Sequence, residues 1–223
     1  MNKMKQVGVI FIVLFFPIVI FAQNEMELRK SAEKGDSNAQ LELARILLES
    51  HKLEEAERWL LCSAKQDNEM AQVFLGVYYE MFCENYEEAI KWFMKAGEQG
   101  NGEALYSIGD FYAEGKGVKK DTKKAFYYYD KSSKCGYSNG MNMMALALLY
   151  GGIEDFVIER DIYKAKELFK ISAELGNMVG QRWLGICYLE GLGVEKNRDE
   201  AIKWLNKAKE QGDEEAKNIQ VNN

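Results

Sequence analysis

The side chains that could support catalysis in this 223-residue chain are few and stand apart from one another. The single histidine, His51, lies in the polar stretch ESHKLEE with no fixed neighbour. His-based catalytic triads and multi-histidine metal sites are therefore excluded. The paired carboxylates Glu54-Glu55 and Glu214-Glu215 are expected on outer helix faces, where they solvate the surface. We expect no catalytic residue, no metal ligand and no cofactor.

Two glycine pairs, Gly-Lys-Gly at 115–117 and Gly-Leu-Gly at 191–193, precede predicted helices, as the glycines of phosphate-binding loops do. These pairs follow no predicted strand, however, and they recur at equivalent places in an internal repeat. We interpret them as structural turns.

The repeat is visible in the endings of the predicted helical segments, AEKGD, AKQDN, GEQGN, SKCGY, AELGN and AKEQGD, which recur every 32 to 40 residues. After each ending comes a segment with small and large apolar residues at i, i+4, i+5 and i+8, which is one helix face. A second segment has an alanine followed by large apolar residues at i+3 and i+4 and a small residue at i+7, again a helical stripe. Four of these second helices have a predicted cap four residues before the alanine: Asn85, Asp121, Asp161 and Asn197. Lys52 stands at that place in the first repeat, where no cap is expected.

The pattern of a small residue, Leu-Gly, Tyr, Gly-x-Gly-Val, Asp, Lys-Ala, Trp and a final Gly resembles the Sel-one-like repeat (SLR) family, relatives of the tetratricopeptide repeats. The copies ALYSIGDFYAEGKGVKKDTKKAFYYYDKSSKCG and GQRWLGICYLEGLGVEKNRDEAIKWLNKAKEQG match it best. The resemblance implies an all-α fold, a right-handed α-solenoid of about five antiparallel helix pairs with half-repeat helices at both ends. We expect a signal peptide at 1–22 and one solenoid over 23–223, with repeats at about 36–67, 68–100, 101–136, 137–176 and 177–212.

The N-terminus has the composition of an export signal. Lys3 and Lys5 precede an uncharged run from Val7 to Phe21, and Ala22 supplies the small residue expected before a cleavage site. We predict cleavage before Gln23 and a periplasmic or extracellular location in a bacterium, with an uncleaved membrane anchor as the alternative. The remaining chain would carry 27 basic and 35 acidic residues, so nucleic acid and anionic lipid are poor partners.

Four cysteines in an exported chain suggest disulfides, and the resemblance implies that some secreted relatives link their helix pairs in this way. Here Cys62 lies near the end of one predicted helix and Cys83 follows the next helix. Antiparallel helices about a dozen residues long would place these two thiols much farther apart than a disulfide allows. Cys135 and Cys187 are separated by a whole repeat, so we predict four free thiols.

The predicted function is that of an exported, non-catalytic scaffold that binds a protein or peptide. A cell-envelope hydrolase or a lactamase-like enzyme, and an inhibitor or immunity-type protein that caps a toxin, are the alternatives. The resemblance implies that the first helix of each repeat lines a concave groove, where Leu41, Leu48, Leu146 and Leu149 either bind a partner or pack on neighbouring helices. The polar and aromatic groove positions are Glu80, Tyr106, Asp110, Asn142 and Arg182. We expect Tyr106 to anchor an extended peptide, whose basic group meets Glu80 or Asp110 and whose backbone bonds to Asn142.

Overall fold

The computed structural model describes residues 25–153 and 156–220, and these residues are almost entirely helical. A helix over residues 25–33 precedes the labelled helices. These are α2 (Ser37–Glu49), α3 (Leu53–Ala64), α4 (Glu69–Met81), α5 (Tyr86–Glu98), α6 (Gly102–Glu114), α7 (Thr122–Lys134), α8 (Ser138–Tyr150), α9 (Ile162–Glu174), α10 (Met178–Glu190), α11 (Arg198–Glu210) and α12 (Glu214–Asn218). The predicted all-α architecture of successive helix pairs is confirmed. We call α2, α4, α6, α8 and α10 the A helices, and α3, α5, α7, α9 and α11 the B helices.

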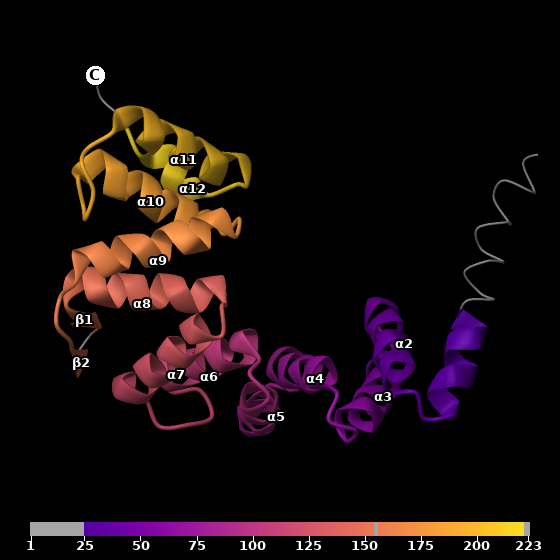
Figure 1. Cartoon of the computed structure of the whole chain (residues 1–223). Helices are drawn as coiled ribbons and strands as arrows, with labels where there is room; N and C mark the ends of the chain where they lie inside the picture. Colours follow the sequence, from indigo (N-terminus) through magenta and orange to yellow (C-terminus); the bar gives the residue numbers. More distant parts are fainter. Residues whose placement is uncertain (1–24, 154–155, 221–223) are drawn as a thin grey trace, which may run out of the picture. The chain divides into compact units, whose positions relative to one another are not determined.

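The described residues divide into two compact units, with the boundary between Cys83 and Glu84. In the first unit, α3 packs against both α2 and α4. In the second unit, each helix from α5 to α12 packs against the next along the chain, and Figure 1 shows α8, α9 and α10 lying in succession. Each A helix in this second unit therefore has a B helix on either side of it in the sequence.

Asparagine and aspartate side chains fix where the helices begin. The predicted caps Asn85, Asp121, Asp161 and Asn197 each accept a hydrogen bond from a backbone N–H three residues later, and Lys52 makes no such bond, as expected. The A helices have the same device, which we did not predict: their caps are Asp36, Asn68, Asn101 and Asn177, and Asp213 caps α12. Tyr137, in front of α8, is the exception and makes no cap bond.

Small residues bring the helices of a pair close together, as the repeat pattern predicted. A Cβ atom added at Gly109 in α6 would lie 2.5 Å from the Tyr129 ring of α7, and one at Gly185 in α10 would lie 2.7 Å from the Leu205 side chain of α11. Tyr129 and Leu205 are almost completely buried. The helix backbones can approach this closely only because these two positions carry no side chain.

Between α8 and α9 lies secondary structure that we did not predict. Strands β1 (Gly152–Ile153) and β2 (Phe156–Val157) pair in an antiparallel hairpin, with Gly152 opposite Val157. The Phe156 ring lies 4.9 Å from the ring of Phe126 in α7. This aromatic contact connects the hairpin to the preceding repeat.

All four cysteines are free, as predicted. Cys62, Cys83 and Cys135 are exposed, whereas Cys187 is buried in α10. Burial raises the pKa of the Cys187 thiol to about 11. Cys187 therefore stays protonated near neutral pH and behaves as a small core residue.

Candidate partner-binding surface

Two of the predicted site residues, Tyr106 and Asp110, lie one turn apart on α6 and belong to one cluster. The Tyr129 hydroxyl of α7 donates a hydrogen bond of 2.6 Å to Asp110 Oδ1. The Tyr106 ring lies 5.5 Å from the Tyr129 ring and 5.7 Å from the Tyr137 ring. Asp110 and Tyr106 are both half-buried, so each side chain keeps a solvent-facing part. We call Tyr106, Asp110, Tyr129 and Tyr137 the tyrosine–aspartate cluster.

The Asp110 carboxyl is held in a partly dehydrated setting. Burial raises its pKa above the ordinary value of 3.8, and hydrogen bonds from Tyr129 and Tyr106 oppose this shift without cancelling it. Burial is also the main reason why the pKa values of Tyr106 and Tyr129 are raised, with the Asp110 charge adding to it. Both phenols therefore remain protonated donors. The net upward shift at Asp110 means that its negative charge is less well stabilised here than in water.

Two other predicted residues, Asn142 and Arg182, join one repeat to the next. Asn142 is 3% exposed, and its Nδ2 donates to Oδ1 of Asn177, the cap of α10, over 2.9 Å. Arg182 Nη1 pairs over 2.9 Å with Oδ1 of Asp213, the cap of α12. Tyr106 occupies the equivalent place in α6, and its ring contacts Tyr137, which stands at the cap position of α8.

In the second unit, Tyr106, Asn142 and Arg182 therefore contact the residues at the cap positions of α8, α10 and α12. The contact is between aromatic rings where Tyr137 stands at the cap position, a hydrogen bond between amides where Asn177 stands there, and an ion pair where Asp213 stands there. Glu80 belongs to α4 in the first unit and is half-buried. The full row from Glu80 to Arg182 stays a prediction, whereas Tyr106 and Asp110 lie together in one cluster.

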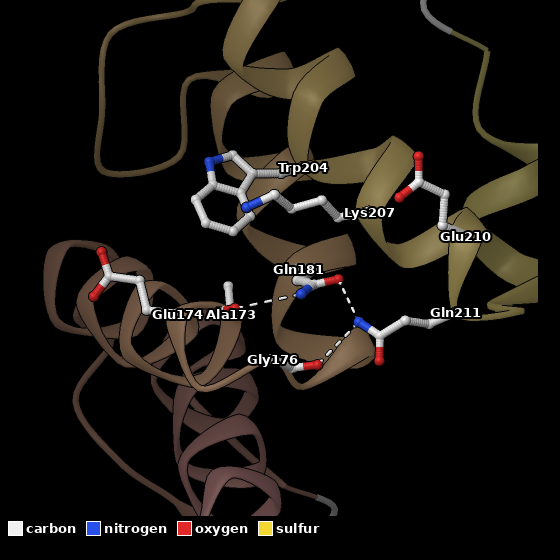
Figure 2. A pocket seen from close by; sticks show the side chains of 8 residues that line it. All are labelled: Ala173, Glu174, Gly176, Gln181, Trp204, Lys207, Glu210 and Gln211. Atoms are coloured by element: carbon white, nitrogen blue, oxygen red, sulfur yellow. Dashed lines mark hydrogen bonds between the residues drawn. The ribbon is translucent and has the colours of Figure 1, made fainter.

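A cavity of about 490 Å³ near the C-terminal end is lined by Trp204, Lys207 and a group of polar side chains from α9, α10 and α11. Figure 2 shows Gln211 between the Gly176 carbonyl and Gln181, to which its Nε2 donates over 3.0 and 2.8 Å. Gln181 Nε2 donates in turn to the Ala173 carbonyl over 3.4 Å. Lys207 Nζ lies 4.3 Å from the centre of the Trp204 ring and covers that face.

The glutamines of this cavity repeat a joint found in the first unit. There Gln66 Nε2 donates to Gln40 Oε1 over 2.9 Å, and Gln40 donates to the Ala32 carbonyl over 3.0 Å. Our sequence reasoning missed this joint, although Gln40, Gln72 and Gln181 each follow a small residue at the same place in the repeat. Because the amides bond to each other and to the backbone, we interpret this cavity as a structural junction.

Within residues 25–153 and 156–220, no group of three or more His, Cys, Asp or Glu side chains is placed to hold a metal ion. The same residues contain no helix with the length and apolar character needed to cross a membrane.

Comparisons with known proteins identify five repeats of one family in this chain. The family model for the Sel1 repeat matches residues 37–68, 70–101, 102–137, 138–177 and 179–213. A Sel1 repeat protein from Oxalobacter formigenes has a similar structure, with a TM-score of 0.77 and 29% identity; the match covers 86% of this chain and 57% of that one. The c5321 protective antigen of uropathogenic Escherichia coli, which displays an SLR fold, has a TM-score of 0.72 and 31% identity over 86% of this chain and 42% of that one.

A curated relative, the exopolysaccharide production negative regulator of Rhizobium leguminosarum bv. viciae, is 29% identical over 136 residues. This match covers 56% of the present chain and 51% of the regulator, so the chain spans about half of that relative's length. Proteins built from Sel1 repeats are typically non-catalytic scaffolds for protein interactions. The fold, the repeat register and the family match together show that this chain belongs to the Sel1 repeat family, with the α-solenoid fold of that family.

Proposed function

We propose that this protein is a non-catalytic scaffold that holds a segment of a partner protein on the A-helix face of residues 84–223. The observation that carries the proposal is the tyrosine–aspartate cluster. A carboxylate oriented by Tyr129 lies beside the half-exposed ring of Tyr106. The segment would present a lysine or arginine to Asp110 and an apolar or aromatic group to Tyr106.

A basic side chain suits this cluster for two physical reasons. The Asp110 charge has lost part of its hydration, and a partner cation would stabilise it by direct pairing. A cation near the Tyr106 ring also gains cation–π attraction, which is worth about 0.5–2 kcal/mol. Because the Tyr129 hydroxyl already fixes the carboxylate, little side-chain entropy is lost on binding.

Selection from a random peptide library tests the proposal and does not require the natural partner. Phage-displayed peptides of about a dozen residues are panned on the purified protein and then counter-selected on the Asp110→Asn variant. Asparagine keeps the shape of the side chain and an acceptor oxygen but removes the charge. We expect peptides enriched in Lys or Arg that bind Asp110→Asn and Tyr106→Ala at least about tenfold more weakly.

A matched control is Glu214→Lys, which changes a carboxylate that is 79% exposed on α12. It should bind the selected peptides as the wild type does. The proposal fails if the selected peptides lack basic residues, or if they bind Asp110→Asn as tightly as the wild type while both proteins remain folded.

We also propose that the chain is exported, because Lys3, Lys5 and the apolar run that follows them have the composition of a signal peptide. The full chain is expressed in a bacterial host, and the N-terminus of the protein recovered from the periplasm is sequenced. We expect Gln23 as the first residue. Recovery of the chain with Met1 in the membrane fraction would instead support the uncleaved anchor.

A further inference from the structure

The loop between α6 and α7 and the first turn of α7 carry a charge opposite to that of the whole chain, and we call this segment, residues 115–124, the basic loop. Residues 116–124 contain five lysines and one aspartate, whereas the full chain has a net charge of −6. Lys119, Lys120, Lys123 and Lys124 are exposed. In the part of the chain that the structure describes, no ion pair involves Lys119, Lys123 or Lys124. These like charges repel one another and favour an anionic partner.

The equivalent loop of the fifth repeat shows that the fold does not require these lysines. Both loops have two glycines with left-handed φ angles: 75° and 65° at Gly115 and Gly117, and 77° and 67° at Gly191 and Gly193. Both also end with the cap residue donating its N–H to a tyrosine carbonyl, Asp121 to Tyr112 over 2.9 Å and Asn197 to Tyr188 over 3.0 Å.

The charges of the two loops differ despite this shared backbone. Residues 115–124 carry five positive charges and one negative charge, whereas residues 191–200 carry two positive and three negative charges. The same turn therefore forms with net charges of +4 and −1. Because the acidic version folds in the same way, the basic version calls for an explanation other than folding.

A cavity of about 390 Å³ lies within the basic loop, lined by Tyr112, Val118, Lys119, Lys120, Asp121 and Lys124. Tyr112 and Val118 form its apolar part. The Tyr112 ring is stacked on Tyr128 of α7, with centres 5.6 Å apart and planes 4° from parallel, so this wall is packed against α7. Lys124 Nζ lies 4.9 Å from the centre of the Tyr112 ring. The cavity thus combines an apolar wall with a basic rim, the usual layout of a site that orients a ligand by its charges.

We propose that this loop binds an acidic peptide segment, with one apolar side chain against Tyr112 and Val118 and flanking carboxylates on Lys119, Lys123 and Lys124. The kind of ligand follows from the positive charge and the small extent of the site. The lysines are concentrated around one cavity instead of forming the long stripe that follows a nucleic acid backbone. This site is lined by other residues than the tyrosine–aspartate cluster, which attracts groups of the opposite charge.

The repeat itself supplies a variant that should fold. Lys119→Glu, Lys123→Asp and Lys124→Glu together place at this loop the residues that the fifth repeat has at 195, 199 and 200. The control changes three exposed lysines elsewhere by the same total charge: Lys34→Glu, Lys65→Asp and Lys164→Glu. The probe is the fluorescently labelled peptide Glu-Glu-Phe-Glu-Glu, and its binding to the full protein is measured by fluorescence anisotropy.

We expect the loop variant to bind this probe at least about tenfold more weakly than the wild type, and the control variant to bind it within about twofold. Replacing Phe by Ala in the probe should weaken binding to the wild type several-fold, because the apolar wall loses its contact. Asp110→Asn should bind the probe as the wild type does, so the outcome does not depend on the proposed function.

Three results would overturn the proposal: no binding of the probe to the wild type, equal weakening in the loop and control variants, or tighter binding of an oligothymidylate than of the peptide. The second would mean that only the overall charge matters. The third would assign the loop to nucleic acid.

Discussion

The close approach of α6 and α7 at Gly109 reverses the usual effect of a glycine-to-alanine change. Inside a helix, alanine is normally more stable than glycine by about 1 kcal/mol. At Gly109, however, the added Cβ would lie 2.5 Å from Tyr129 Cε1 and 2.6 Å from Cδ1. Tyr129 is 3% exposed, and its hydroxyl is tied to Asp110 over 2.6 Å. The ring therefore cannot move aside without losing packing and a hydrogen bond.

The size of the effect follows from these contacts. Overpacking a core costs about 1–3 kcal/mol, and losing a hydrogen bond to a charged group costs about 1.5–3 kcal/mol. Adding these two costs and subtracting the gain of about 1 kcal/mol in helix propensity, we expect Gly109→Ala to lower the free energy of unfolding by about 1.5–5 kcal/mol. Urea unfolding followed by circular dichroism measures this difference.

Two further variants isolate the cause. Gly97→Ala in α5 is the control, because its nearest neighbour is Leu105 Cδ2, the flexible end of a side chain, at 2.9 Å. It should change stability by less than about 1 kcal/mol. In a Tyr129→Ala background, Gly109→Ala should become stabilising, since the obstructing ring is gone. A Gly109→Ala protein more stable than the wild type would refute this reasoning.

Three other outcomes are expected. Arg182→Met should lower the free energy of unfolding, measured in urea, by about 3–5 kcal/mol, because the nearly buried Asp213 carboxylate loses its cation. The double variant Arg182→Met/Asp213→Ser should recover part of this loss. Equal stability of Arg182→Met and the wild type would contradict the pairing. Asp110 has a folded-state pKa above its unfolded value near 3.8, so between these two pKa values the folded protein binds more protons than the unfolded chain. The contribution of Asp110 to stability therefore falls as the pH rises from below 3.8 through the folded-state pKa. Urea titrations from acid to neutral pH should therefore show Asp110→Asn gaining stability relative to wild type, and the opposite trend would mean that the hydrogen bonds outweigh the burial. Iodoacetamide at pH 8 should alkylate Cys62, Cys83 and Cys135 in the native protein, and Cys187 only after unfolding. Mass spectrometry identifies the labelled residues. Labelling of Cys187 in the native protein would show that α10 opens readily.

The helices and their caps were largely predictable because their signals are local. Asn85 and Asp121 lie at fixed distances from a repeated alanine, and the structure confirms both as caps. The caps of the A helices were equally visible in the sequence, since Asn101 and Asn177 each follow the glycine that ends a repeat. They were missed because the apolar columns, which define the repeat register, do not include them.

The contacts of the predicted groove residues were harder to predict because their partners lie a whole repeat away. Asn142 bonds to Asn177, which is 35 residues further along, and Arg182 pairs with Asp213, 31 residues further along. Their positions in the helix predicted that both side chains would face a partner at the surface. In the structure, each instead contacts the cap residue of a later helix, Asn177 or Asp213. Tyr106 and Asp110 were both predicted from the groove positions that the resemblance implies, and because they lie one turn apart they share one face of α6.

The half-repeat α12 determines where this array can be shortened or lengthened. It places Ala216 on the core cluster of Leu205 and Ala208, and its cap Asp213 pairs with Arg182. A chain cut after Gly212 would expose an apolar edge and leave a guanidinium without its carboxylate, which favours self-association. An added full-length A helix that keeps Asp213 and Ala216 would retain both contacts and present a new face to another B helix. Position 213 is therefore the natural splice point for adding repeats to this protein.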